Sequence, residues 1–183
     1  MTRAPYPIHR FQLVRHPDFP CDAIQTIEVT AHRIEDAIRA RLELTYVLTG
    51  SIAKLCIPEE PSGDRVDGLW QHTCCEVFIK GAGDSYGEFN FAPSTAWAAY
   101  TFMNYRNGMT NASVPSPRIR VDRDAHRLRV NVELDCSDLP FAKDHWRLAL
   151  SAVIEEVDGR KSYWALAHRT PPDFHHESAF VSL

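Results

Sequence analysis

The sequence lacks several patterns that mark common classes of protein. No apolar run is long enough to cross a bilayer, and the formal net charge of −4 is spread over interspersed charges without a concentrated basic face. No P-loop, GxGxxG or GxSxG motif is present, which excludes the commonest nucleotide-binding and serine-hydrolase patterns. We therefore expect neither nucleic acid nor a membrane as a partner.

Leader and cysteine motifs are lacking as well. The N-terminal stretch MTRAPYPIHR has no apolar core followed by a cleavage site, which favours a cytoplasmic protein. The five cysteines are odd in number and form no CxxC pair, so we expect reduced thiols rather than a disulfide framework or a zinc site. Adjacent Cys74 and Cys75 would point to opposite faces of a strand. The 183 residues, 44% of them hydrophobic, suit one domain over residues 1–183.

Short strands with regular turns replace any long helical pattern. Leu42, Leu44, Tyr46 and Leu48 alternate with polar residues, and the same period of two recurs from Leu128 to Leu134. Further strands are predicted at the following ranges: an edge strand at 8–14, then 26–34, a hairpin partner at 52–57, 118–121, 146–157, 161–168 after the Asp158-Gly159 turn, and 179–183. The predicted fold is an all-β, antiparallel β-sandwich of the immunoglobulin-like or jelly-roll-like type.

The stretch from Leu69 to Met109 carries the main candidate site. In 73–80, Val77 and Ile79 share one face while Glu76 shares the other; in 86–92, Phe89 and Phe91 lie opposite Glu88 and Asn90. Matching the apolar residues of this hairpin places the polar ones together on the other face. Because two carboxylates directly opposite would repel, the register with Glu76 beside Asn90 is preferred.

This polar face and its neighbouring rings suit a sugar. Carboxylates and an amide exchange directional hydrogen bonds with hydroxyl groups, and aromatic rings stack on the apolar face of a pyranose. Trp70, Trp97, Tyr100 and Tyr105 supply rings. Alternatively, the tryptophans fill the core and the polar residues form a solvated face. A third interpretation is an enzyme, because a carboxylate pair such as Glu76 and Glu88 on neighbouring strands fits glycoside hydrolysis.

The C-terminal segment supplies further candidates. His168, Asp173, His175 and His176 combine imidazole and carboxylate, which could serve an enzyme or a metal, although their spacing matches no ligand motif. Arg106 could bind an acidic ligand or pair internally with Glu76 or Glu88. The loop EEPSGDRVDG is rich in oxygen ligands for calcium but lacks EF-hand spacing, so calcium stays open.

Three pieces of the chain resemble the DOMON-like family related to type 9 carbohydrate-binding modules, in particular its bacterial stand-alone members. They are LWQHTCCEVFI, YGEFNFAPSTAWAAYTFMNYRNGM and YWALAHRTPPDFH, and the resemblance covers most of the chain from Thr26. It implies a β-sandwich that binds ligands: sugars in type 9 modules, often with calcium, and haem in other branches. Met103 and His168 could hold haem only if the fold brings them together, so a haem protein is not expected.

These observations together predict a small-ligand binding module for a carbohydrate or sugar derivative. The alternatives are an enzyme using Glu76 and Glu88 or the C-terminal His and Asp residues, and a haem-binding or purely structural domain. No catalytic or metal-binding residue is assigned, and the oligomeric state is left open. The predicted ligand-binding residues are Trp70, His72, Glu76, Glu88, Asn90, Trp97, Arg106, His168, Asp173 and His175.

Overall fold

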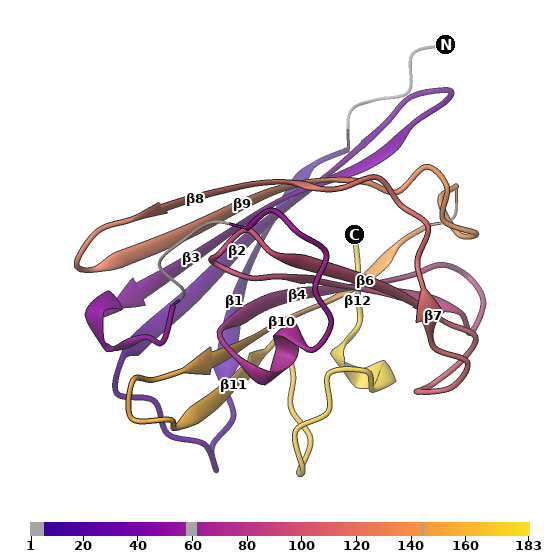
Figure 1. The fold of residues 1–183 in the computed structure, drawn as a ribbon. Helices are drawn as coiled ribbons and strands as arrows, with labels where there is room; N and C mark the ends of the chain where they lie inside the picture. The colour runs from indigo at the N-terminus through magenta and orange to yellow at the C-terminus, as the bar shows by residue number, and fades with distance from the viewer. Residues whose placement is uncertain (1–5, 58–61, 144) are drawn as a thin grey trace.

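The computed structural model describes residues 6–57, 62–143 and 145–183, and these residues form an antiparallel β-structure with three short 3-10 helices (Figure 1). The all-β, antiparallel class predicted from the sequence is confirmed. Within these ranges no helix has the length and apolar character needed to span a membrane. All five cysteines are free; Cys74, Cys75 and Cys136 are buried.

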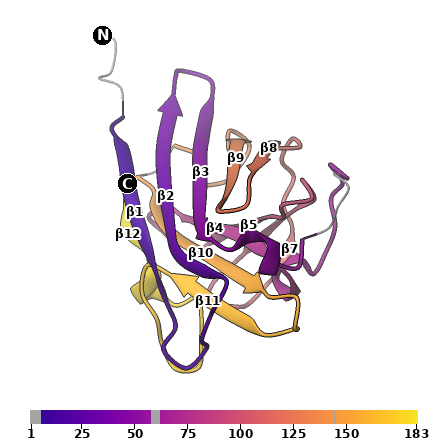
Figure 2. The same ribbon diagram turned by 90° about the vertical axis from the view of Figure 1, so that its left-hand side faces the viewer.

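The described strands join into one curled sheet. Their bounds are β1 (Ile8–Arg15), β2 (Ile24–Glu35), β3 (Ala40–Gly50), β4 (Cys74–Lys80), β5 (Tyr86–Phe91), β6 (Trp97–Phe102), β7 (Thr110–Asn111), β8 (Arg118–Arg123), β9 (Arg127–Asp135), β10 (Arg147–Glu155), β11 (Lys161–Ala165) and β12 (Val181–Ser182). The order across the sheet is β7-β6-β5-β4-β10-β11-β1-β2-β3-β9-β8, with β12 added beside β10. In Figure 2, β2 and β3 run nearly upright while β10 and β11 cross below them.

Strand β1 joins the two halves of this sheet. Residues Ile8–Leu13 pair with β2, and Val14 and Arg15 pair with β11. The prediction of an edge strand was wrong, because the sheet order places β1 between β11 and β2. Pro17, on which the prediction depended, lies in the turn after β1, where no ladder hydrogen bond is needed. A single strand therefore carries the chain from one half to the other.

The predicted strand at 52–57 is also wrong. Both edges of β3 are taken, by β2 and by β9, so the chain after Gly50 must leave the sheet. It forms a 3-10 helix, Ile52–Lys54, followed by one bridge from Leu55 to Glu156. Gly50 suits this exit, since a Cβ at this position would lie 2.0 Å from the carbonyl oxygen of Ala23.

The main core lies between the two halves. Inward side chains of β2, β3 and β9 pack with those of β4, β5 and β10 in one apolar cluster. Across it, the buried Tyr46 hydroxyl of β3 donates a hydrogen bond of 2.6 Å to the Glu76 carbonyl of β4. The alternation predicted for β3 and β9 is thus confirmed by the burial of every second residue.

The half-sheet from β6 to β10 is covered on both faces. Every residue of β5 is buried, as is every residue of β4 except Lys80. On the face away from the main core, Phe78, Tyr86 and Tyr100 belong to a second apolar cluster closed by Phe180 after the short helix η3 (Glu177–Ala179). The candidate site is on this outer face.

The hairpin of β4 and β5 has the predicted register. Val77 pairs with Phe89 and Glu76 pairs with Asn90, as predicted from the match of apolar side chains and the repulsion of opposed carboxylates. The hairpins of β8 with β9 and of β10 with β11, through Asp158-Gly159, are also confirmed. Near the C-terminus, η3 extends to Ala179 and the strand is shorter than predicted, covering Val181–Ser182.

Candidate functional site

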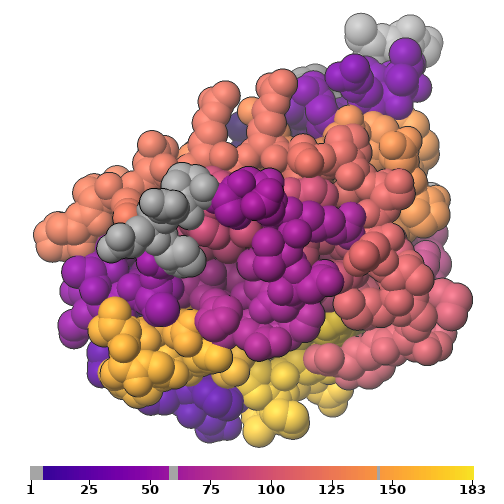
Figure 3. All heavy atoms as spheres, viewed as in Figure 1, coloured from indigo at the N-terminus to yellow at the C-terminus, as the bar shows by residue number. Residues whose placement is uncertain are grey.

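A cavity of about 470 Å³ opens on the outer face of β4, β5 and β10, and we call it the acid-pair cavity. Its described lining residues are Phe19, Trp70, Glu76, Phe78, Glu88, Phe102, Arg106, Met109, Val153, Tyr163, Pro172, Phe174 and His175. The loop after β1, the segment before β4 and the C-terminal segment close it over the sheet. In the space-filling view, the indigo loop and the yellow C-terminal segment lie next to each other at the lower edge (Figure 3).

Glu76 forms part of the cavity floor. The alternation of β4 turns its side chain away from the main core, and the residue is 2% exposed. Ser151, its cross-strand partner on β10, donates a hydrogen bond of 2.8 Å from Oγ to Oε2. Burial, and then the nearby Glu88, raise the pKa of Glu76 to about 8. The hydrogen bond from Ser151 lowers this pKa, but it is the smallest of the three effects. Glu76 therefore carries a proton at neutral pH.

Glu88 lies on the same floor, diagonal to Glu76 across the ladder, where side chains of neighbouring strands stay within reach. Its Oε1 accepts a hydrogen bond of 2.9 Å from Asn90 Nδ2. Burial raises the pKa of Glu88, while Asn90 and Arg106 lower it in part. Because Glu88 has these two stabilising neighbours, it is the carboxyl of the pair that ionises first.

His175 connects the acid pair to the surrounding rings. Its Nδ1 is 2.7 Å from the Tyr86 hydroxyl, and its Nε2 is 3.6 Å from Glu88 Oε2. Burial, followed by the charge of Arg106, lowers the pKa of His175 to about 4, so the ring is neutral near pH 7. The Tyr86 oxygen also accepts a hydrogen bond of 3.1 Å from the backbone N–H of Arg106.

Arg106 is held by Asp173 and not by the acid pair. Its Nη2 and Nε lie 2.8 Å and 3.2 Å from Asp173 Oδ1, and Tyr105 also donates to this carboxylate. The suggested internal partners Glu76 and Glu88 are therefore corrected: Arg106 reaches only far enough to lower the pKa of Glu88 by its charge. The ion pair fastens the loop after β6 to the C-terminal segment.

Trp70 stands beside the acid pair as a half-exposed ring. The Asp67-Gly68 turn, with Gly68 at φ +79°, starts the 3-10 helix η2 (Leu69–Gln71) that carries it. Its ring meets Tyr100 edge to face at 6.0 Å, and the Tyr100 hydroxyl donates to Asp67 Oδ1 at 2.8 Å. Trp70 is 40% exposed, so one side of the ring is available to a ligand.

Trp97 lies on the opposite face of the sheet. It pairs with Phe91, whose side chain faces the main core, and it is 5% exposed there with the Arg65 guanidinium 5.2 Å from its ring. The expected pair of tryptophans at one site is thus corrected: of the two, Trp70 lines the cavity and Trp97 belongs to the core. The turn between β5 and β6 determines this register, and residue types alone did not reveal it.

Two predicted histidines lie outside the cavity. His72 is exposed, with Nδ1 2.6 Å from Glu155 Oε2, and His168 bonds the Val14 carbonyl at 2.6 Å beside the His16 ring. The C-terminal cluster is therefore divided: His175 lines the cavity, Asp173 holds Arg106 beside it, and His168 and His176 lie outside it. Met103 is 64% exposed, and neither Met103 nor His168 lines the acid-pair cavity, so this cavity does not bring the two residues together.

The metal alternatives gain no geometry from the described residues. Among them, no three His, Cys, Asp or Glu side chains gather as a metal would require. In the loop EEPSGDRVDG, residues 58–61 lie outside the described part of the chain, and Asp67 accepts the Tyr100 bond. The calcium expectation therefore rests on the sequence alone.

Several cavity residues were not among the predicted ones. Phe78 follows Glu76 at the spacing that puts both on one strand face, so the alternation could have revealed it. Ser151 faces Glu76 from a strand far along the chain, and only the pairing of β10 with β4 reveals this contact. The remaining missed wall residues are Phe19, Phe102, Met109, Val153, Tyr163, Pro172 and Phe174.

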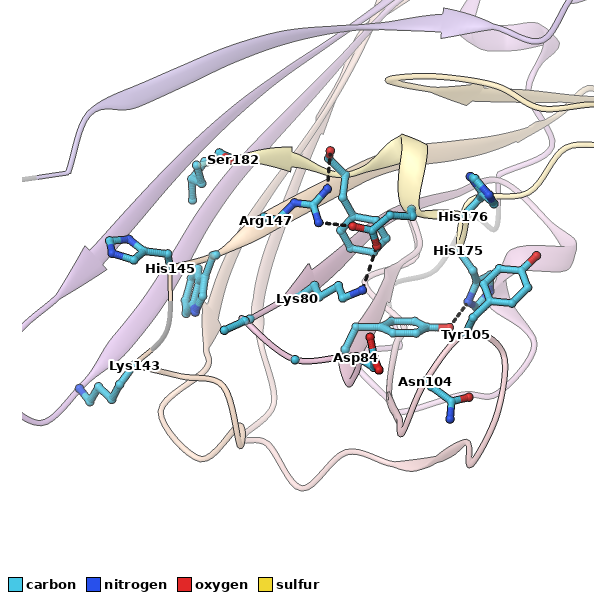
Figure 4. Close-up of a pocket in the computed structure, with 18 of the residues that line it drawn as sticks. Lys80, Asp84, Asn104, Tyr105, Lys143, His145, Arg147, His175, His176 and Ser182 are labelled. Atoms are coloured by element: carbon cyan, nitrogen blue, oxygen red, sulfur yellow. Dashed lines mark hydrogen bonds and ion pairs between the residues drawn. The ribbon is translucent and has the colours of Figure 1, made fainter.

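A second, wider cavity of about 1460 Å³ adjoins the first and shares His175 with it (Figure 4). Lys80 Nζ is 2.8 Å from Glu177 Oε2, and Arg147 pairs with the other oxygen of the same carboxylate. Figure 4 shows Lys80 and Arg147 converging on this carboxylate, while Lys143 and His145 lie apart. Two cations that line the second cavity, Lys80 and Arg147, are thus already paired with Glu177. We therefore take the acid-pair cavity as the candidate site.

Comparison with known proteins places the fold. Two solved structures share it. A candidate carbohydrate-binding protein from Bacteroides uniformis has a TM-score of 0.64 and 13% identity, over 97% of this chain and 85% of that chain. A family 9 carbohydrate-binding module from Caldicellulosiruptor kristjanssonii, solved in complex with glucose, has a TM-score of 0.50 and 13% identity, over 87% of this chain and 77% of that chain. No protein-family model matches the sequence, and no curated protein does.

Proposed function

We propose that this chain is a small-ligand binding protein whose acid-pair cavity takes a carbohydrate or a sugar derivative. The observation that carries the proposal is the pair of buried carboxyls, Glu76 and Glu88, at the floor of an aromatic-lined cavity of about 470 Å³. Ligand sites of this size commonly combine apolar walls with a few convergent polar groups. A β-sandwich of the DOMON-like and type 9 kind is the architecture we propose for it.

The chemistry of the cavity matches a pyranose. The protonated Glu76 can donate and accept hydrogen bonds, while Glu88, the carboxyl that ionises first, accepts them, so adjacent sugar hydroxyls find partners of both kinds. Trp70 offers a ring face for the apolar side of the sugar. The structural neighbour solved with glucose and the candidate carbohydrate-binding protein support the same ligand class.

Titration of the protein with monosaccharides and disaccharides, followed by calorimetry, tests the proposal. We expect at least one sugar to bind, and Trp70→Ala to weaken its binding by about tenfold or more, because the stacking ring is lost. His72→Ala is the matched control, since His72 is a surface residue outside the cavity, and should bind as the parent does. Absence of heat and of thermal stabilisation with every sugar would contradict the proposal.

An acid–base enzyme is the second candidate function. The specific observation in its favour is that the pKa of Glu76 is raised to about 8 beside a carboxyl that ionises first, which is how an acid and a base are separated in glycosidases. Turnover of aryl glycosides that is lost in both Glu76→Gln and Glu88→Gln would establish it. Binding of a sugar without turnover would contradict the enzyme and support the binding protein.

A further inference from the structure

The polar face of the acid-pair cavity has more hydrogen-bond acceptors than donors. Glu76, Glu88 and Asn90 present their side-chain oxygens on one face of β4 and β5. Two bonds serve them, from Ser151 to Glu76 and from Asn90 Nδ2 to Glu88. Asn90 Oδ1 is fully buried and has no hydrogen-bond partner among the described residues. A buried acceptor without a donor is costly, so this face favours a ligand that brings donors.

The carboxyl pair in the cavity has no cation of its own among the residues that the structure describes. Arg106 is the one guanidinium or ammonium group among its described lining residues, and its charge is matched by Asp173 at 2.8 Å. His175 is neutral near pH 7. Burial also raises the pKa of three other titratable groups near the pair, which are therefore uncharged at this pH: Tyr86 of β5, Tyr100 of β6 and Cys74 of β4. Glu88 is left without a dedicated counter-ion.

We propose that the cavity selects a cationic sugar derivative, an amino sugar whose protonated primary amine lies between Glu76 and Glu88. This inference rests on the proposed function and narrows its ligand class. A positive charge between the two carboxyls removes the repulsion that keeps them from ionising together. The rings of Phe78 and Phe102, which line the same cavity, offer faces to a cation.

A primary amine fits better than a quaternary ammonium group. The –NH₃⁺ group carries three N–H donors for the carboxyl oxygens of Glu76 and Glu88, which both line the cavity. A quaternary ammonium group has the charge but no N–H donor, so it would form a hydrogen bond with neither carboxyl. The acceptor surplus, together with the charge, therefore selects the amine.

Binding of the amine has a proton signature. In the free protein Glu76 holds a proton near pH 7; with an ammonium group between the carboxyls the ionised form is favoured, so the Glu76 proton leaves to the buffer. A neutral sugar leaves that proton in place. Calorimetry in buffers with different heats of ionisation counts the released protons on the unmodified protein.

The test compares glucosamine, N-acetylglucosamine and glucose in such calorimetric titrations. We expect glucosamine to bind about tenfold or more tightly than the other two, with release of a proton that they do not cause, because acetylation removes the charge and two of the three donors. Glu88→Gln should bring glucosamine down to the affinity of glucose. Glu155→Gln, outside the cavity, should not.

The outcomes separate the two proposals. Equal affinity for glucosamine, N-acetylglucosamine and glucose, without proton release, would overturn the amine inference and leave sugar binding intact. If neither these three sugars nor any other sugar in the panel binds, the proposed function is overturned and the inference with it. Preference for glucosamine with proton release in the unmodified protein supports the inference even where Glu88→Gln fails to fold.

Discussion

Glu76 and Glu88 are chemically alike but have different surroundings. Glu76 lies deeper, with Ser151 as its donor, whereas Glu88 has the Asn90 amide, the nearby charge of Arg106 and the Nε2 of His175. The two carboxyls on this floor therefore ionise one after the other as pH rises, Glu88 before Glu76. This asymmetry gives the cavity a donor and an acceptor in fixed places.

The buried Glu76 predicts that stability falls with rising pH. Its pKa is raised from 4.5 to about 8 in the folded state, so between these values the folded chain holds a proton that the unfolded chain has lost, and unfolding becomes easier as pH rises. Glu76→Gln removes this loss. At about pH 9 we expect the variant to be more stable than the parent by on the order of 2–4 kcal/mol, and at about pH 5 to be equal within about 1 kcal/mol.

Urea unfolding at both pH values measures this difference. Glu28→Gln is the control, because Glu28 is an exposed position of β2 on the other half of the sheet, and it should shift neither curve by more than about 0.5 kcal/mol. A Glu76→Gln variant whose stability follows the parent across the whole pH range would contradict the raised pKa.

At the scale of elements, the cavity combines the sheet with two segments outside it. The sheet supplies the floor, while the loop after β6 and the C-terminal segment supply Arg106, Phe174 and His175. Asp173 fastens these two segments: it accepts from Arg106 and Tyr105, and from the His175 backbone N–H at 3.1 Å. These two walls are therefore joined to each other through one carboxylate, in addition to the ring contacts of His175 with Phe78, Tyr86 and Phe102.

Asp173→Ala is expected to loosen these walls without unfolding the protein. Because the ion pair with Arg106 is partly exposed, its loss should cost about 1 kcal/mol or less of global stability. Hydrogen exchange of residues 103–109 and 170–176 should nevertheless accelerate, and sugar affinity should fall. Asp158→Ala removes an exposed partner of Arg160 at the turn of β10 and β11, and should leave both segments unchanged. Unchanged exchange in Asp173→Ala would show that other contacts hold the walls.

At the scale of the whole molecule, the two halves of the curled sheet are joined by β1 and by the core between them. The hydrogen bond from the Tyr46 hydroxyl to the Glu76 carbonyl, at 2.6 Å, crosses that core. Burial raises the pKa of Tyr46, which keeps the hydroxyl protonated as a donor. The contact thus connects the far half-sheet to the strand that carries the acid pair.

Tyr46→Phe tests this connection. Removing the hydroxyl removes this buried hydrogen bond and should lower the free energy of unfolding by about 1–2 kcal/mol. Tyr105→Phe removes an exposed hydroxyl from Asp173 and should cost less than about 0.5 kcal/mol. Equal stability of Tyr46→Phe and the parent in urea unfolding would show that the contact contributes nothing.

The local pattern of the sequence determined the strands and the register of β4 with β5. Period-two alternation assigns each side chain to a face, so matching Val77 with Phe89 put Glu76, Glu88 and Asn90 on one face, and the repulsion of opposed carboxylates then selected Glu76 beside Asn90. Only the tertiary structure decided that β1 is internal, that Trp97 faces the core, and that Ser151, Arg106 and His175 surround the pair. These contacts join segments far apart in the chain, and alternation carries no information about which strand pairs with which.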